Sequence, residues 1–279
     1  MFKILKKEEW SPSVFAMEIE APRVAKKAQA GQFIVLRVDE KGERIPLTIA
    51  DFNRETGAVL IVFQVIGAST MKLAELKVGD SIVDFVGPLG QPSEIEKLGT
   101  VVVVGGGIGV APTYPIARAM KEAGNKVIAI MGAKTKDILI MEEEMKAVTD
   151  EVVVTTDDGS YGIKGFVTNA VQALVDRGEK IDQITAIGPV IMMKSVADAT
   201  RDLGIRTIVS LNPIMVDGTG MCGGCRLTVG GKTKFACVDG PDFDGFEVDF
   251  DEAMARGASY KPFEQKAREE ACNLLKQAE

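Results

Sequence analysis

The chain of 279 residues contains no histidine. Ser-His-Asp hydrolysis, Cys-His proteolysis, imidazole zinc sites and Rieske clusters each require a ring nitrogen, so none of these chemistries is available. Any catalysis must therefore depend on other side chains or on a bound cofactor.

Positive charge is also in short supply, with 33 Lys and Arg against 40 Asp and Glu and a formal net charge of −7. Nucleic-acid binding is driven largely by Lys and Arg at phosphates, so this balance excludes a nucleic-acid partner. No run approaches the roughly 20 apolar residues of a membrane span, and the lysines of MFKILKKEEWSP precede no apolar segment of the kind found in signal peptides. We expect a cytoplasmic protein.

Cysteine is scarce as well, and three of the four cysteines fall between residues 222 and 237. Such clustering is more typical of metal ligation in a reducing compartment than of a disulfide framework. The fourth, Cys272, lies in a C-terminal helical pattern, where we expect it to act as a small buried apolar residue.

Residues 1–98 have a strand-rich pattern with one short helical stretch, TMKLAEL. The strand-like stretches are rich in Val, Ile, Phe and Thr and are separated by turn residues. They are FAMEIEAP, QFIVLRVD, RIPLTIADF, AVLIVFQVI and SIVDFVG. We predict an N-terminal antiparallel six-stranded β-barrel.

Residues 99–212 alternate between apolar strands and helical patterns, beginning with TVVVVGGG and ending with RTIVSLN. This alternation predicts a central α/β domain with an open parallel sheet covered by helices on both faces. Residues 213–279 form a small C-terminal region with the cysteine loop, an acidic Gly-rich stretch and a last helix. The predicted fold class is thus β + α/β.

The strand-to-helix turn GGGIGVAP, Gly105 to Pro112, is a candidate phosphate cradle because its backbone N–H groups can approach an anion at a helix N-terminus. Pro112 suits the first helical turn. Asp157 and Gly188 follow two further predicted strands, at the edge where an open parallel sheet binds ligands. The alternative is a tight turn without a ligand.

Two barrel stretches are candidates of the same kind. Glu43 to Thr48 (ERIPLT) could be a strand edge, and Ser69 and Thr70 in IGASTMKLAEL could simply cap a helix. Either segment taken alone is more typical of structure than of binding, but their order before a nucleotide-type domain favours binding.

Together these motifs resemble the ferredoxin-NADP-reductase superfamily over essentially the whole chain. The motifs are R-x-P-L-T (Arg44, Pro46, Leu47, Thr48), G-A-S-T (Gly67, Ala68, Ser69, Thr70), G-G-G-I-G-x-A-P (Gly105, Gly106, Gly107, Gly109, Pro112) and the cysteine loop. The resemblance is closer to the small flavin and iron–sulfur subunits typified by the dihydroorotate dehydrogenase electron-transfer subunit. The acidic start of the loop is most similar to the small subunits of NADH-dependent reduced ferredoxin:NADP oxidoreductases, also known as sulfide dehydrogenase subunits.

The resemblance implies that Arg44 to Thr48 line the flavin ring and ribityl chain of FAD and that Gly67 to Thr70 take its pyrophosphate. It also implies that Gly105 to Pro112 hold the nicotinamide nucleotide. Thr48 is the candidate for a hydrogen bond near flavin N5, and the alternative is that its hydroxyl satisfies strand backbone.

The loop DGTGMCGGC, with Cys237, gives the spacing D-x4-C-x2-C-x11-C. This parallels a plant-type [2Fe-2S] loop with Asp217 in place of the first cysteine, followed by Cys222, Cys225 and Cys237. Structural zinc in a Cys3Asp site is the alternative, and Asp239 and Asp242 are nearby substitutes for Asp217. The dihydroorotate dehydrogenase pattern has cysteine at the first position, which favours the other subunit type.

A nicotinamide moves two electrons, an iron–sulfur cluster moves one, and a flavin can exchange either number, so the three sites in this order form a converter. Such a chain needs a partner, and the resemblance implies a larger subunit with its own FAD, an NADPH site and [4Fe-4S] clusters, in a heterodimer that bifurcates electrons and is linked indirectly to ferredoxin.

Several alternatives remain open. They are a dihydroorotate dehydrogenase electron-transfer subunit, a ferredoxin or sulfide reductase subunit that uses NADP(H), a stand-alone reductase with a zinc-stabilised tail, and a redox-sensing module without turnover. Lys134, Lys136 and Asp137 follow the second predicted strand of the α/β domain, so residue type does not decide between NAD and NADP. We follow the resemblance and expect NAD(H).

Overall fold

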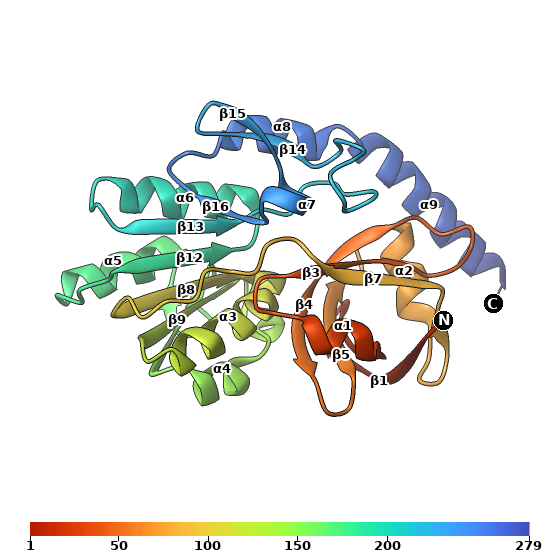
Figure 1. The fold of residues 1–279 in the computed structure, drawn as a ribbon, viewed down its shortest axis with the longest axis horizontal. Helices are drawn as coiled ribbons and strands as arrows, with labels where there is room; N and C mark the ends of the chain where they lie inside the picture. The colour runs from red at the N-terminus through yellow and green to blue at the C-terminus, as the bar shows by residue number, and fades with distance from the viewer. Residues whose placement is uncertain (279) are drawn as a thin grey trace.

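Two large sheets lie side by side in the computed structural model, which describes the backbone of residues 1–278 and the side chains of residues 1–270 (Figure 1). The N-terminal sheet forms the right half of Figure 1 and the α/β sheet the left half, and the C-terminal segments pass across the top of both. The side chain of Cys272 lies outside the described residues.

The first sheet is antiparallel, with the strand order β6-β1-β2-β5-β4-β3-β7, and it confirms the predicted barrel architecture. Its strands are β1 (Phe2–Ser11), β2 (Val14–Glu20), β3 (Phe33–Arg37), β4 (Ile45–Asn53), β5 (Ala58–Gln64), β6 (Ser81–Ile82) and β7 (Asp84–Leu89). The sheet has seven strands where six were predicted. SIVDFVG divides into β6 and β7, and the charged sequence of β1 gave no strand signal although β1 pairs along most of β2.

Two short helices belong to this half of the chain. The predicted one is α2 (Ala68–Glu75), and α1 (Pro22–Lys27) was not predicted because six residues are too few for a helical period. The interior of the barrel is filled by aliphatic side chains and by Phe63 and Phe85.

The second sheet has the order β11-β10-β9-β8-β12-β13-β16. Its strands are β8 (Thr100–Gly106), β9 (Lys126–Ala133), β10 (Glu151–Thr156), β11 (Ile163–Lys164), β12 (Gln183–Ile187), β13 (Arg206–Ser210) and β16 (Asp242–Asp244). The helices between them are α3 (Val110–Glu122), α4 (Glu142–Val148), α5 (Val167–Asp176) and α6 (Val190–Arg201), with the single turns η1 (Gly107–Gly109) and η2 (Lys136–Ile138). The strands of residues 99–212 are all parallel, which confirms the prediction, and β16 of the C-terminal region adds one antiparallel strand at the edge by pairing with β13.

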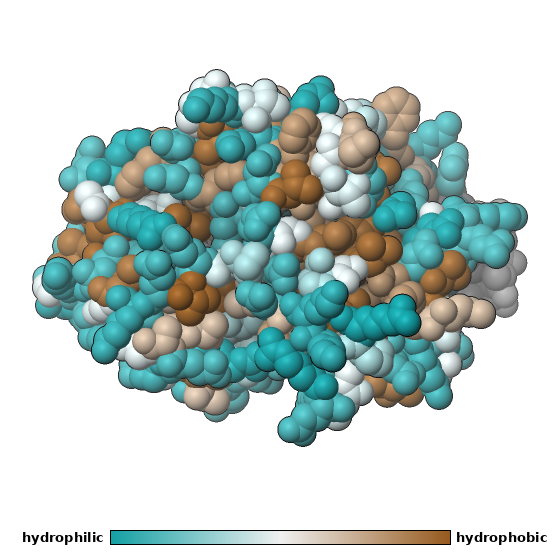
Figure 2. All heavy atoms as spheres, viewed as in Figure 1, coloured by the Kyte–Doolittle hydropathy of each residue, from teal (hydrophilic) through white to brown (hydrophobic). Residues whose placement is uncertain are grey.

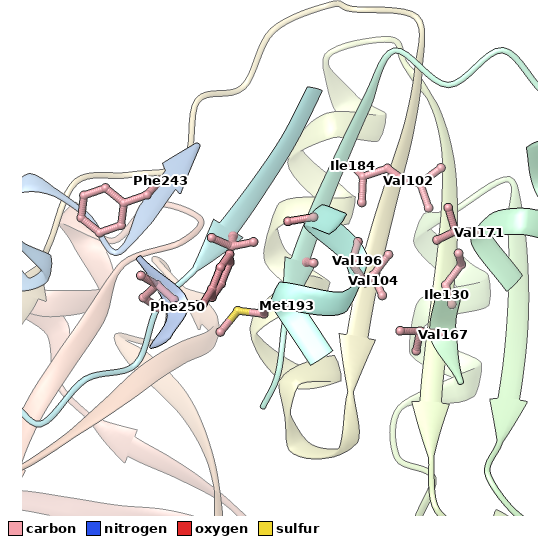
Figure 3. Close-up of a cluster of buried hydrophobic side chains, with 14 of the residues drawn as sticks. Val102, Val104, Ile130, Val167, Val171, Ile184, Met193, Val196, Phe243 and Phe250 are labelled. Carbon is pink, nitrogen blue, oxygen red and sulfur yellow. The ribbon is translucent and has the colours of Figure 1, made fainter. Parts of the chain in front are cut away.

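The core of the α/β half lies on both faces of its sheet. On one face Val102, Val104, Ile130 and Ile184 meet side chains of α5 and α6, among them Met193 (Figure 3). On the other face α3 packs against the sheet together with apolar residues of β2, β4 and β5, so this second core joins the barrel to the α/β half.

The C-terminal region contains more structure than the predicted loop and helix. It has a hairpin of β14 (Arg226–Val229) and β15 (Lys232–Phe235), followed by α7 (Ala236–Asp239), α8 (Phe250–Ala258) and α9 (Lys261–Ala278). In Figure 1, α9 runs toward the barrel beside α2, and these two helices are in contact. Within the described part of the chain, no helix is both long and apolar enough to span a membrane.

Candidate functional site

A single cavity of about 2800 Å³ lies between the barrel, the α/β sheet and the C-terminal segments. It is lined by almost all of the predicted cofactor-binding residues. These are Arg44, Pro46, Leu47, Thr48, Gly67, Ala68, Ser69, Thr70, Gly106, Gly107, Gly109, Pro112, Asp157 and Gly188. Cys222 also lines it, so the cavity reaches the cysteine loop.

The barrel side of the cavity is formed by the start of β4 and the N-terminus of α2. Thr70 is the third residue of α2 and forms the capping-box contact at its start, because its Oγ1 accepts hydrogen bonds from the backbone N–H groups of Ile66 (3.0 Å) and Gly67 (3.1 Å). Ser69 makes no such cap and instead donates to a carboxylate oxygen of Glu43 (2.6 Å). The predicted pair of capping hydroxyls is therefore one cap and one contact between the two barrel motifs.

Thr48 lies in the register position opposite Phe33 of β3, on the cavity wall. Its hydroxyl makes no hydrogen bond to any described residue, so the predicted alternative, in which it satisfies strand backbone, is not what the structure shows. The hydroxyl is free to contact a bound molecule.

The glycine turn follows β8 and leads through η1 into α3. Gly105 is the one predicted residue that does not line the cavity, since a Cβ there would lie 2.6 Å from the Cα of Val110. Its role is close packing of strand and helix. Gly107 has φ of +57° and faces open space, so a side chain there would project into the cavity. Pro112 lies in the first turn of α3, as predicted from its missing N–H.

The carboxyl ends of β9 and β10 form the far wall of the cavity. Lys134 and Asp157 both line it, and neither side chain has an ion-pair partner among the described residues. Phe166, which the sequence analysis did not single out, also lines the cavity although 66% of its surface is exposed. The sequence offers only a weak signal for it, an aromatic residue directly after Gly165 between β11 and α5, and its exposure comes from the structure.

The cysteine loop lies at the junction between barrel and α/β sheet. Cys225 and Cys237 are buried with their sulfurs 3.3 Å apart, in the same apolar core as Phe33 and Val35 of the barrel. Cys222 is exposed, and the N–H of Gly224 lies 3.5 Å from its sulfur. Burial and the neighbouring Cys225 thiol raise the pKa of Cys237 to about 12. A cation is therefore what would hold this sulfur as thiolate.

Asp217 begins the loop with its carboxylate folded over it. One oxygen accepts from the N–H of Thr219 (2.8 Å) and the other from the N–H of Cys222 (2.7 Å). These two hydrogen bonds lower the pKa of Asp217, and the one from Thr219 has the larger effect. The carboxylate is therefore ionised, and it lies directly beside Cys222.

The two substitute carboxylates have other roles. Asp239 accepts from the N–H of Phe235 (2.7 Å) at the start of α7, and Asp242 accepts from the hydroxyl of Ser93 (2.5 Å) in the segment that joins the two sheets. Across the residues that the structure describes, no three metal-ligating side chains stand in a ready-made metal site.

The residues present fit the predicted groups. Three thiols and one carboxylate in a glycine loop are a donor set for an iron–sulfur cluster and also for zinc. In the cavity, Nε of Arg44 is buried and has no hydrogen-bond partner, which is the mark of a guanidinium that faces a missing acceptor. The cradle at Gly107 is open to the cavity, as a bound nucleotide requires.

Comparison with known proteins agrees with this arrangement. Residues 103–198 match the family model of the oxidoreductase NAD-binding domain, and residues 212–249 match that of the iron-sulfur cluster binding domain of dihydroorotate dehydrogenase B. These matches confirm the NAD(H) and iron–sulfur parts of the predicted cofactor set. The ferredoxin NADP+ reductase of Neisseria gonorrhoeae, solved with bound FAD and NADP, has the same fold, with a TM-score of 0.59 at 18% identity over 73% of this chain and 90% of its own.

Fold and site thus define an oxidoreductase subunit for electron transfer. The chain belongs to the family of dihydroorotate dehydrogenase B electron-transfer subunits. A homolog of that subunit from Thermotoga maritima is 54% identical over 93% of this chain and 91% of its own, and the subunit of Streptococcus mutans is 35% identical over 89% and 97%. A solved structure of the NADH-dependent reduced ferredoxin-NADP oxidoreductase contains a chain 52% identical to this one, with a TM-score of 0.92 and 97% of both chains covered.

Proposed function

We propose that this chain is the small subunit of an electron-bifurcating NADH-dependent reduced ferredoxin:NADP oxidoreductase. It moves electrons between NAD(H), FAD and a [2Fe-2S] cluster and passes them on to a larger subunit. The observation that supports this proposal is the one cavity that joins Thr48, the glycine turn and Cys222. The 52% identity to a chain of such an enzyme, against 35% to the dihydroorotate dehydrogenase B subunit of Streptococcus mutans, supports this proposal over a dihydroorotate dehydrogenase subunit.

In this proposal the chain has three parts: residues 1–98 bind FAD, residues 99–212 bind NAD(H), and residues 213–279 bind the cluster. β16 ties the third part to the second by joining its sheet. When bound, the flavin supplies the exchange between two-electron and one-electron carriers.

The residues of the chain bind and orient. Arg44, Leu47 and the N-terminus of α2 with Gly67 to Thr70 would hold FAD, and the Thr48 hydroxyl would donate a hydrogen bond near flavin N5. Gly106 to Pro112, with Gly188 and Asp157, would hold the nicotinamide nucleotide. Pro46, whose ring fixes φ, lies near the start of β4 at the cavity wall.

We propose Asp217, Cys222, Cys225 and Cys237 as the cluster ligands. Asp217 is the carboxylate next to Cys222, whereas Asp239 and Asp242 are hydrogen-bonded elsewhere. The carboxylate must give up its bonds to the loop N–H groups, at least in part, to reach a metal.

Three described cysteines are free, which supports a reducing, cytoplasmic location.

The surface around the cysteine loop supports docking of the larger subunit, for which we propose a flavin and [4Fe-4S] protein that forms a heterodimer with this chain. Val216, Met221 and Val238 are exposed apolar residues in and beside the loop, and Met221 is 85% exposed. In Figure 2, apolar side chains gather near the middle of the visible face, between the two halves of the molecule. An exposed apolar patch next to a one-electron carrier suits a protein partner.

The direct test is the content of the purified protein. We expect two iron atoms, two acid-labile sulfides and one FAD per chain after anaerobic reconstitution, with the absorption shoulder of a cluster beside the flavin bands. Zinc without labile sulfide would overturn the cluster assignment, and a protein that takes up no flavin would overturn the converter.

A further inference from the structure

Arg44 faces two sites at once. Its Nη2 donates to the backbone carbonyl of Asp217 across 3.4 Å, and its Nε is buried without a hydrogen-bond partner at the cavity that we assign to FAD. It precedes β4 directly, so the short barrel edge that carries Thr48 also reaches the first residue of the cysteine loop.

No carboxylate neutralises this guanidinium in the described part of the chain. The adjacent Glu43 bonds to Ser69 instead, and Arg44 has no ion pair with any described residue. A guanidinium presents several donors in a rigid plane, so two acceptors in different directions can be bound by one side chain. Nη2 contacts the loop, and the buried Nε has no acceptor among the described residues.

The loop segment at residues 217 and 218 rests on the barrel. Gly218 has φ of +75°, and a Cβ there would lie 2.8 Å from Leu89 of β7 and 3.2 Å from Val35 of β3. Val35 pairs with Pro46, two residues after Arg44. Apolar packing thus fixes the distance between this loop segment and the barrel. The hydrogen bond from Arg44 is the polar contact that orients the backbone of the segment.

The other limb of the loop has an anchor of a different kind. The backbone N–H of Gln91 donates to the carbonyl of Gly240 (2.7 Å), and its side chain donates to the carbonyl of Val238 (2.9 Å). Gln91 does not line the FAD cavity. Of the two anchors, only the one at Asp217 includes a group that a bound FAD can contact.

We propose that Arg44 is a positioning residue that couples FAD binding to the geometry of the cluster. An acceptor oxygen of FAD takes the open Nε, fixes the guanidinium plane and so strengthens the bond to Asp217, the proposed first ligand. This inference rests on the proposed function, because it requires FAD in the cavity and a cluster in the loop.

The coupling must act in both directions. FAD steadies the cluster, and the cluster raises the affinity for FAD by the same factor, since binding linkage is reciprocal. One hydrogen bond of this kind corresponds to a change of about fivefold.

The test uses the full-length chain with reconstituted cluster, with and without saturating FAD. The readouts are the rate of cluster bleaching by an iron chelator and the electron paramagnetic resonance spectrum of the dithionite-reduced cluster. In the wild type we expect FAD to slow bleaching about fivefold and to shift the g values. In Arg44→Gln and Arg44→Lys we expect neither effect of FAD, while the cluster itself still forms.

Arg54→Gln is the matched control. Arg54 donates to the carbonyl of Ala28 (2.9 Å), stacks on Phe52 and lies outside the cavity, so its removal should leave the FAD effect intact. If an Arg44 variant retains too little FAD for the comparison, the dissociation constant of FAD is measured with and without cluster in the wild type and in Arg44→Lys, and only the wild type should show a difference.

The inference is overturned if both Arg44 variants keep the full effect of FAD on the cluster, or if a wild-type chain that binds both groups shows no such effect. Both results leave the proposed function standing. A wild-type chain that forms no cluster or binds no FAD overturns the proposed function first, and the inference with it.

Discussion

At the scale of single residues, Arg44, Thr48 and Cys222 come from three distant stretches of the chain and line one cavity. Each belongs to a motif with fixed spacing, and for that reason the sequence predicts it. Phe166 belongs to no motif. Whether an exposed aromatic side chain faces a cavity or open solvent depends on contacts between distant segments, which one sequence does not encode locally.

Replacing Asp217 tests the first ligand. Asp217→Ala removes both the proposed ligand and the bonds to the N–H groups of Thr219 and Cys222. We therefore expect the cluster to bleach at least tenfold faster, which corresponds to an activation free energy of bleaching lower by about 1.4 kcal/mol. Asp217→Cys should restore a stable cluster. Asp239→Asn is the control, and equal bleaching rates in Asp217→Ala and the wild type would exclude Asp217 as ligand.

Replacing Phe166 tests the nucleotide wall. An aromatic face at the cavity can stack on a base, so Phe166→Ala should raise the dissociation constant of NADH about fivefold, corresponding to roughly 1 kcal/mol, and that of AMP equally. Leu203→Ala, exposed and outside the cavity, should change neither. Titration by flavin absorbance and by calorimetry gives both constants. Unchanged AMP affinity in Phe166→Ala would place the base elsewhere.

At the scale of helices and strands, continuous apolar runs were predicted reliably and short polar segments were not. β8, β9 and β12 are buried on both faces, and their sequences are correspondingly rich in Val, Ile and Ala. β16 is three residues with two aspartates, and only its pairing with β13 makes it a strand. β1 has few apolar residues among many charged ones, so its sequence carries no clear strand pattern. Its pairing with β2 is what makes it a strand.

The cap of α2 lends itself to a measurement of stability. Thr70→Ala removes the acceptor for the N–H groups of Ile66 and Gly67 and should lower the free energy of unfolding by about 1 kcal/mol. The loss should also weaken FAD binding, because the same turn lines the cavity. Ser69→Ala removes only the bond to Glu43 and should unfold in urea like the wild type; a cap at Ser69 instead would reverse the two results.

The contact between Ser93 and β16 predicts a pH dependence of stability. Burial raises the pKa of Asp242, and its second oxygen has no hydrogen-bond partner. The folded state therefore holds this proton at a pH where the unfolded state has released it, so stability falls as the pH rises from the unfolded pKa to the folded pKa. Asp242→Asn should lack this decline in urea unfolding at a series of pH values. An identical slope in both proteins would show that another group titrates.

At the scale of the whole molecule, one cavity is lined by residues predicted to bind FAD, by residues predicted to bind the nicotinamide nucleotide and by Cys222 of the cysteine loop. The order of barrel, α/β sheet and C-terminal region was predicted from the pattern of apolar and turn residues. The packing of the C-terminal region against the other two parts was not predicted. It adds a strand to the second sheet, and it passes α9 along α2 of the barrel (Figure 1). The α2 and α9 segments are more than a hundred residues apart in the chain, β13 and β16 are about thirty apart, and no local pattern records either contact.

That arrangement explains why the chain needs no histidine. In the proposed function the side chains bind and orient the carriers, and the exchange of electrons is the chemistry of the bound groups. Nicotinamide, flavin and cluster would then share one site and be reduced together.

The most direct test of that claim is the anaerobic visible spectrum of the loaded protein before and after addition of NADH, with a second sample that receives NADPH. The account predicts that NADH bleaches both the flavin bands and the iron–sulfur shoulder, and that NADPH does so far more slowly. A flavin that is reduced while the iron–sulfur absorption stays unchanged, or a protein that neither nucleotide bleaches, would contradict it.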